Sequence, residues 1–244
     1  MPKTLRRPPR RNPRAPAGPT LPQSHNDCVL RTRPLSLVSP DGVTPLAKIG
    51  QGMFAAVYRE TTGQQRVFAI VDEGVYDKEV AVMAHEDDPR NPHLPRVERF
   101  GMLTDLRSVF TMPFYTVPYR VANANPASRA AFTALRKCIG SIFPKYDGRT
   151  GQRERGYETA QRKLACIEEA GAKIPPKLVD AVRGLHEMSM NYDDQYDFEF
   201  SPRNVATDDQ GNLVLLDVLF NRDNVDRVMK ARLRKIIPSG LRSW

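Results

Sequence analysis

An asparagine and an aspartate in the C-terminal third of the chain have the side chains and the spacing for metal-assisted chemistry. Asn204 lies two positions after Pro202, and Asp217 follows Asn204 by thirteen positions, at the end of the apolar run 213–216. Two short strands joined by a tight turn can bring such an amide and such a carboxylate to one magnesium ion. Sites that transfer a phosphoryl group from ATP hold the metal in this way. The sequence therefore predicts that Asn204 and Asp217 are metal ligands.

The order of features around these two residues strengthens the prediction. A predicted helix and an acidic loop come first, then Asn204, and then a hairpin that ends at Asp217. The turn of this hairpin, residues 208–212, contains the Asp, Gly and Asn residues that favour tight turns. A plain β-hairpin with both residues on its surface is the alternative.

A second candidate segment contains two glycines, Gly50 and Gly52, between two predicted strands. Glycines let backbone N–H groups approach phosphates because no Cβ stands in the way. The same spacing also occurs in ordinary hairpin turns. Since strands lie on both sides and no helix follows, the segment does not match a dinucleotide-binding fingerprint. A loop that covers phosphates is the functional interpretation.

The elements that must position these residues begin with an antiparallel sheet. Short apolar runs after residue 45 are separated by Gly, Asp or Pro, as expected of neighbouring strands. The predicted strands cover residues 46–49, 54–58, 66–71, 97–103 and 108–117, and a helix is predicted at residues 75–84.

After residue 123 the apolar residues recur at spacings of three and four, which predicts helices. Asn125 is placed to cap the first of them, with Pro126 in its first turn. Further helices are predicted at residues 157–167, after Pro176, and at residues 224–237, where the closing helix is basic and amphipathic. The fold class is therefore predicted to be α+β, with a sheet half followed by a helical half.

The net charge of +9 is concentrated in the first 34 residues, which are rich in Arg and Pro. Such a segment buries too little apolar surface to offset its chain entropy, so a disordered arm is expected. The three cysteines match no zinc or redox spacing, which favours reduced thiols in a cytoplasm. No apolar run reaches the roughly 20 residues of a membrane span, so no membrane contact is expected.

Together these features resemble the eukaryotic-type protein-kinase fold over residues 44–222. The chain looks most like the early serine/threonine protein kinases of autographivirus-type bacteriophages. The motif H-R-D-x-x-x-x-N falls on residues 197–204, and D-F-G falls on residues 217–219. The resemblance implies a bilobal molecule with a small antiparallel sheet lobe, which carries one helix, and a reduced, mainly helical C-lobe. The implied parts are a disordered basic arm (1–34), an N-lobe (35–120), a C-lobe (121–222) and a basic C-terminal helix (223–244).

The resemblance also implies roles for single residues. Asn204 and Asp217 would bind magnesium, and Glu199 would replace the catalytic aspartate. Asp197 is the alternative base if the register of the loop slips. The residues implied to contact ATP are Gly50, Gly52, Val57, Glu79 and Met112.

The implied function is that of an ATP- and magnesium-dependent protein serine/threonine kinase that phosphorylates host proteins during takeover of a bacterial cell. The implied location is the host cytoplasm. Host proteins are the expected partners, with RNA polymerase among the candidates. The basic tails could add non-specific, salt-dependent contact with nucleic acid. The Arg-rich loop 149–155 and these tails are the surfaces expected to dock protein substrates.

Three departures from the family pattern keep alternatives open, and one of them is that only 27 residues follow Asp217. The strand that should end in an ATP-pairing lysine is apolar throughout, and the nearest cations are Lys48, Arg59, Arg66 and Lys78. Glu199 adds one methylene to the catalytic carboxylate. A pseudokinase that binds and inhibits a host protein such as RNA polymerase is therefore the main alternative, and a small-molecule phosphotransferase is a weaker one.

Overall fold

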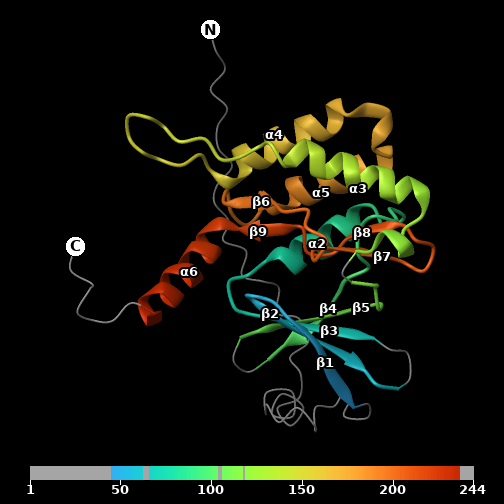
Figure 1. The fold of residues 1–244 in the computed structure, drawn as a ribbon. Coiled ribbons are helices and arrows are strands. Elements are labelled where there is room, and N and C mark those ends of the chain that lie inside the picture. The colour runs from blue at the N-terminus through green and yellow to red at the C-terminus, as the bar shows by residue number, and fades with distance from the viewer. Residues whose placement is uncertain (1–44, 63–65, 104–105, 118, 237–244) are drawn as a thin grey trace.

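The computed structural model describes residues 45–62, 66–103, 106–117 and 119–236. The predicted arm at residues 1–34 lies outside them. A five-stranded antiparallel sheet forms one half of the molecule and helices dominate the other (Figure 1). The chain is therefore α+β, as predicted.

The sheet has the strand order β1-β2-β3-β5-β4, with every neighbouring pair antiparallel. Its strands are β1 (Leu46–Gln51), β2 (Ala55–Glu60), β3 (Val67–Val71), β4 (Glu98–Met102) and β5 (Ser108–Met112). The central strand β3 is buried along its whole length, which explains its unbroken apolar sequence. The last strand was predicted to run to residue 117 but ends before Pro113, since proline lacks the N–H that the ladder needs.

Helix α2 (Asp77–Asp87) links the sheet to the helical half. It contacts α5 on one side and β4 on the other, and it lies between the sheet and the remaining helices in Figure 1. Because it is enclosed on several sides, even its charged residues Lys78 and Glu79 are buried. The prediction placed this helix correctly but began it two residues early.

Three helices follow, α3 (Pro126–Ile139), α4 (Gly156–Glu169) and α5 (Pro176–Ser189), with the short 3-10 turns η1 (Val121–Asn123) and η2 (Gly171–Lys173) beside them. The predicted cap of α3 is confirmed, because the Asn125 side chain accepts a hydrogen bond of 2.8 Å from the N–H of Ser128. Helix α4 begins at Gly156, where a Cβ would lie 2.3 Å from the backbone of Gln195. Only glycine lets α4 approach the loop that precedes β6.

Two short antiparallel strand pairs complete the helical half. β6 (Tyr196–Phe198) pairs with β9 (Leu219–Asn221), and β7 (Val205–Thr207) pairs with β8 (Leu213–Leu215). The turn between β7 and β8 contains Gly211 at a φ of +75°, which an L side chain rarely adopts. This ladder confirms the hairpin predicted between Asn204 and Asp217.

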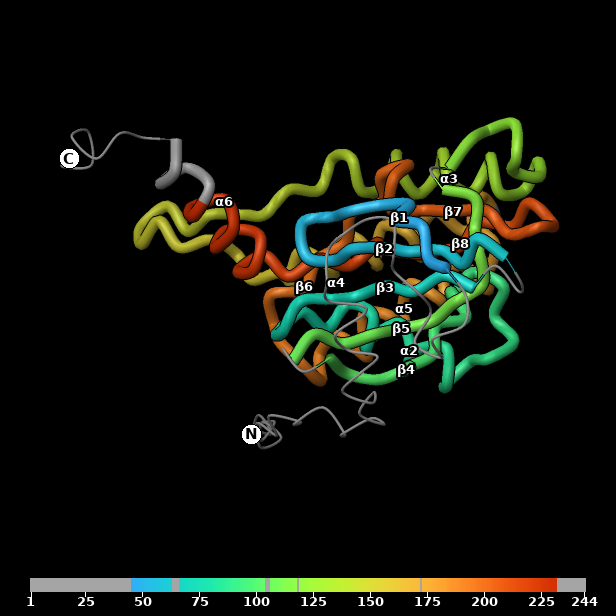
Figure 2. The backbone as a smooth tube through the Cα atoms, turned by 90° about the horizontal axis from the view of Figure 1, so that it is seen from below, coloured from blue at the N-terminus to red at the C-terminus, as the bar shows by residue number. Residues whose placement is uncertain are grey.

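Helix α6 (Arg222–Ile236) follows β9 directly and extends away from the rest of the molecule (Figures 1 and 2). In both views it lies on the same side as the loop 140–155, and α3 lies at the opposite end. No helix within the described residues is both long and apolar enough to cross a bilayer.

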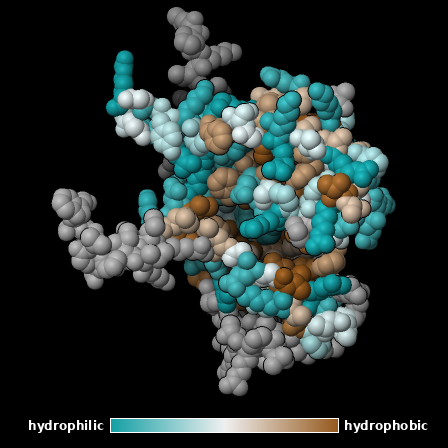
Figure 3. Space-filling model, in the orientation of Figure 1, coloured by the Kyte–Doolittle hydropathy of each residue, from teal (hydrophilic) through white to brown (hydrophobic). Residues whose placement is uncertain are grey.

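One large hydrophobic cluster runs through both halves. It includes Val80 of α2 and Phe110 of β5 together with Leu135, Ile167 and Leu178 of the three following helices. On the face shown in Figure 3, hydrophobic residues gather where the sheet half meets the helical half, and hydrophilic residues predominate over the helices. The two halves are therefore packed against each other through a shared hydrophobic core, and α2 lies at its centre.

Candidate active site

Backbone hydrogen bonds bring the predicted site residues to the ends of the two small ladders. The N–H of Asp217 donates to the carbonyl of Asn204 over 2.9 Å, and the N–H of Glu199 donates to the carbonyl of Val218 over 2.8 Å. Both ends of the loop 199–204 are thus held to residues 217 and 218, which lie between β8 and β9. These contacts join main-chain atoms, so they do not depend on the side chains. They place Asn204 and Asp217 next to each other.

The side chains at these positions carry oxygen atoms that a ligand can reach. The Asp217 side chain is 52% exposed, Glu199 is exposed, and Asn204 is partly exposed. The Asn204 amide nitrogen donates to the carbonyl of Glu199 over 3.3 Å, which leaves the amide oxygen for a cation. Two hard oxygen donors on adjoining strands suit magnesium, which keeps water and phosphate oxygens as its other ligands.

Lys78 of α2 occupies the cationic position beside Asp217. Its Nζ lies 3.1 Å from Oδ1 of Asp217 and 2.8 Å from the carbonyl oxygen of Leu216. The side chain is only 8% exposed. Burial would lower the pKa of Lys78, but Asp217 and Asp77 outweigh it and raise the pKa above its ordinary value. The ammonium group is therefore charged at neutral pH.

A second carboxylate, Asp77 at the start of α2, adjoins the same pair. Its Oδ2 lies 3.8 Å from Nζ of Lys78, and its Oδ1 is buried without a hydrogen-bond partner. Burial, together with the neighbouring Asp217, raises the pKa of Asp77 to about 7 despite Lys78. At Asp217 partial desolvation opposes ionisation, but Lys78 and hydrogen bonding with Asp77 lower the pKa below its ordinary value. The site holds one firmly ionised acid and one that gives up its proton less readily.

The four cations considered as replacements for the missing lysine have different partners. Lys48 donates to the side chain of Gln51 over 2.5 Å, Arg66 pairs with Glu60 at 2.7 Å, and the Arg59 guanidinium lies 3.9 Å from the ring centroid of Phe114. Lys78 is the one that contacts Asp217. The position that matches the family lysine, Val71, is completely buried in β3.

Glu79 follows Lys78 on α2 but faces away from the site. It forms an ion pair with Arg99 of β4, and its side chain is 4% exposed. This pair ties α2 to the edge of the sheet. The structure therefore corrects the role implied for Glu79 as an ATP-contacting residue and places Lys78, its neighbour on the helix, in contact with Asp217.

The two glycines lie at the end of β1 and in the turn that follows it: Gly50 is the second-last residue of β1, and Gly52 stands in the turn to β2. Gly50 pairs with Val57, and the N–H of Gly52 donates to the carbonyl of Ala55 over 2.8 Å. Added Cβ atoms would meet other atoms no closer than 3.7 Å at Gly50 and 3.8 Å at Gly52, and neither residue has a positive φ. The local fold does not require glycine at either position, which leaves room for a requirement imposed by a ligand.

The two apolar residues implied to contact ATP lie on the strands that flank the central strand. Val57 is partly buried in β2, and Met112 is the buried last residue of β5. After Met112 the chain crosses to the helical half, where Thr116 and Thr207 exchange backbone hydrogen bonds of 3.1 and 3.2 Å. The segment 113–117 therefore joins the sheet half to the helical half.

Asp197, the alternative base, lies in a different environment. Its side chain is 3% exposed and accepts hydrogen bonds from Lys163 over 2.9 Å and from Arg222 over 2.5 Å. It also accepts from the N–H of Phe198. A carboxylate enclosed in this way cannot reach an acceptor hydroxyl, so the structure speaks against a catalytic role for Asp197 and leaves Glu199 as the accessible acid.

Sequence reasoning missed three members of these clusters. Asp77, Lys163 and Arg222 were given no role, although Asp77 stands in the charged triplet 77–79 directly before the apolar run 80–84. Charged residues inside a predicted core helix are a usable signal for such a site. Lys163 and Arg222 belong to segments with many other basic residues, so nothing in the sequence distinguishes them.

Comparisons of the chain with protein-family models, with curated proteins and with solved structures gave no match. The assignment of a function therefore depends on the geometry of the site.

Proposed function

We propose that this protein is an ATP- and magnesium-dependent protein serine/threonine kinase. The observation that carries the proposal is the convergence of the loop 199–204 and helix α2 on Asp217. Its backbone is held to Asn204, its carboxylate contacts Lys78 of α2, and the loop 199–204 presents the exposed Glu199 beside it. An amide, a carboxylate and a buried cation are the groups that position and neutralise a phosphoryl donor.

Each residue has a task that follows from its surroundings. The oxygen atoms of Asn204 and Asp217 would hold magnesium, which supplies positive charge beside the phosphates when bound. Lys78 keeps Asp217 ionised and presents a permanent positive charge at the same place. Glu199, which is exposed, orients an acceptor hydroxyl and accepts its proton. The similarity to phage kinases extends the proposal to host proteins as acceptors.

The test is transfer of label from ATP to the protein itself or to a host-cell extract. In Asp217→Asn we expect transfer to fall by about 100-fold or more, because a ligand of the metal and the partner of Lys78 are lost together. The matched control is Asp209→Asn, which makes the same chemical change at an exposed position in the β7–β8 turn. Label that persists in Asp217→Asn at the control level would refute the kinase proposal.

A second candidate function is a pseudokinase that acts by binding a host protein. The observation in its favour is that β3 carries no lysine and that the Lys78 ammonium already neutralises Asp217. Thermal unfolding with and without magnesium and ATP separates the two candidates. A ligand at 100 times its dissociation constant stabilises the folded state by about 2.7 kcal/mol. No shift at any nucleotide concentration favours the pseudokinase.

A further inference from the structure

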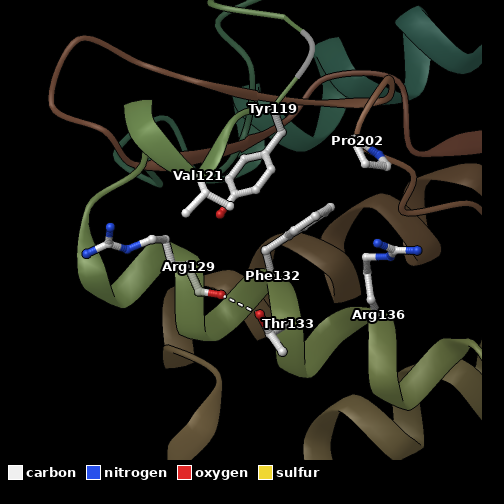
Figure 4. A pocket seen from close by; sticks show the side chains of 7 residues that line it. All are labelled: Tyr119, Val121, Arg129, Phe132, Thr133, Arg136 and Pro202. Atoms are coloured by element: carbon white, nitrogen blue, oxygen red, sulfur yellow. Dashed lines mark hydrogen bonds between the residues drawn. The ribbon is translucent and has the colours of Figure 1, made fainter.

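Two cavities lie side by side along α3, outside the candidate active site. The first has a volume of about 420 Å³ and opens between α3, the chain at Tyr119 and the loop residue Pro202 (Figure 4). The second, about 720 Å³, lies between α3 and the segment from η2 to the start of α5. Both are lined by Arg129 and Thr133. Because the two cavities share these lining residues, we refer to them together as the α3 groove.

The floor of the α3 groove is apolar. Tyr119 and Phe132 are both buried, with ring centroids 4.2 Å apart, and they form the floor of the first cavity. Val121 on its wall is 61% exposed. The second cavity is lined by alanines, prolines and Ile174. Such a surface accepts apolar side chains of a partner.

The rim of the α3 groove is basic. Arg129, Arg136, Lys137 and Lys173 line it, and no acidic residue lines either cavity. Within the described part of the chain, none of these four side chains forms an ion pair. In Figure 4 the side chains of Arg129 and Arg136 extend on opposite sides of Phe132. Unneutralised cations around an apolar floor favour a partner that carries acidic and apolar side chains.

The α3 groove is joined to the candidate active site through Pro202. The N–H of Tyr119 donates to the carbonyl of Pro202 over 2.8 Å and also to that of Val205 over 3.0 Å. Pro202 lies three residues after Glu199 and two before Asn204. Three residues span at most roughly 10 Å. A segment bound in the groove therefore ends within a few residues of the acid that would accept the hydroxyl proton.

We propose that the α3 groove binds an acidic segment of the acceptor protein, with an apolar side chain of that segment on the Tyr119–Phe132 floor. This inference rests on the proposed kinase function and supplies its substrate class. A nucleic acid is disfavoured because a stacked base needs a whole exposed ring face, whereas Tyr119 and Phe132 are only 7% and 6% exposed, which suffices for contact with one aliphatic side chain. The groove also replaces the loop 149–155 as the expected docking surface.

The experiment measures binding of a short fluorescein-labelled peptide by fluorescence anisotropy, with the full chain at physiological ionic strength. The peptide contains glutamates around one leucine and one serine. In the double variant Arg129→Glu/Arg136→Glu we expect about tenfold weaker binding, which corresponds to two partly exposed charge contacts. The matched control is Arg149→Glu/Lys230→Glu, which changes the net charge equally on the opposite side of the molecule. It should bind within about twofold of the original chain.

Three results would overturn the proposal. Equal loss in both double variants means general charge attraction, and loss in the control alone assigns docking to the surface of the loop 149–155 and α6. The third result is that a single-stranded RNA oligonucleotide displaces the peptide and binds more weakly to the Arg129/Arg136 variant. That result assigns the groove to nucleic acid. Far-ultraviolet circular dichroism and thermal unfolding confirm that all variants are folded.

The binding measurement needs no nucleotide, so it stands apart from the kinase proposal. If the peptide binds as expected but the serine is never labelled, the groove is supported and the kinase function fails. If the serine is labelled, the Arg129/Arg136 variant should raise KM and leave kcat unchanged, because these arginines contact the acceptor away from the reacting atoms.

Discussion

Two clusters of the molecule pair a lysine with an aspartate at nearly the same distance, yet they serve different ends. Lys78 lies 3.1 Å from Asp217, and Lys163 lies 2.9 Å from Asp197. The Asp217 side chain is 52% exposed, whereas that of Asp197 is 3% exposed. Pairing alone therefore says little about function, because accessibility decides whether a ligand can replace one of the partners.

The enclosed cluster joins three elements around Asp197. Lys163 comes from α4 and Arg222 from the start of α6, and Arg222 also donates to the backbone of Glu154 over 2.9 Å. One carboxylate pairs with two cations, and all three side chains are less than 10% exposed. Such an arrangement is sensitive to loss of the carboxylate, since two buried positive charges would remain.

The open cluster has the opposite excess. Asp77 and Asp217 share one ammonium group, and the exposed half of Asp217 faces solvent. The carboxylate of Asp217, which water can reach, is therefore available to a metal ion. The following predictions test this contrast.

The largest effect is expected from Asp197→Asn. It should destabilise the protein by about 3–5 kcal/mol, because Lys163 and Arg222 lose their common partner. Urea unfolding measures the change, and Asp209→Asn provides the control for an exposed aspartate. A loss below about 1 kcal/mol would mean that the enclosed cluster does not hold α4 and α6 in place.

The next effect concerns the open cluster. Lys78→Met should lower phosphoryl transfer by about 100- to 1000-fold, since it removes the cation beside Asp217. Lys48→Met is the control, because Lys48 pairs with Gln51 on the edge strand. Equal activity of the two variants would show that another cation serves the phosphates.

A third prediction uses pH near the enclosed cluster. Although burial opposes it, hydrogen bonds from Arg162, the Lys145 N–H and Thr159 lower the pKa of Glu154 to about 2. A lowered pKa stabilises the fold fully above the ordinary value of 4.5, and this contribution is lost as pH falls from 4.5 toward 2. Glu154→Gln should therefore cost about 2–3 kcal/mol at neutral pH and progressively less on acidification.

Urea unfolding of both chains across this pH range provides the measurement for Glu154. A difference between them that stays constant with pH would show that the lost stability comes from packing and not from the ionised carboxylate.

The smallest effect is expected for the stability of Asp217→Asn, about 1 kcal/mol or less. Asp217 is half exposed, and Lys78 retains the Leu216 carbonyl and Asp77 as partners. Urea unfolding measures the free energy of unfolding of Asp217→Asn and of Asp197→Asn side by side. Equal losses in the two variants would remove the distinction between an open and an enclosed cluster.

The sequence by itself determined the local elements and the pairing of Asn204 with Asp217. Apolar runs bounded by Gly and Pro predicted all five strands of the sheet, and Asn125 with Pro126 predicted the start of α3. A hairpin brings its two ends together whatever surrounds it. The turn predicted at residues 208–212 was therefore enough to predict that Asn204 and Asp217 lie close together.

Only the tertiary structure decided which of two neighbouring charges enters the site. Lys78 and Glu79 differ by one residue on α2, and successive residues of a helix point about 100° apart. The rotation of α2 between the sheet and α5 sends Lys78 to Asp217 and Glu79 to Arg99. Likewise β6 ends at Phe198, so Asp197 is sealed by α4 and α6 while Glu199 lies in the exposed loop. These outcomes depend on packing between distant segments, which no local pattern encodes.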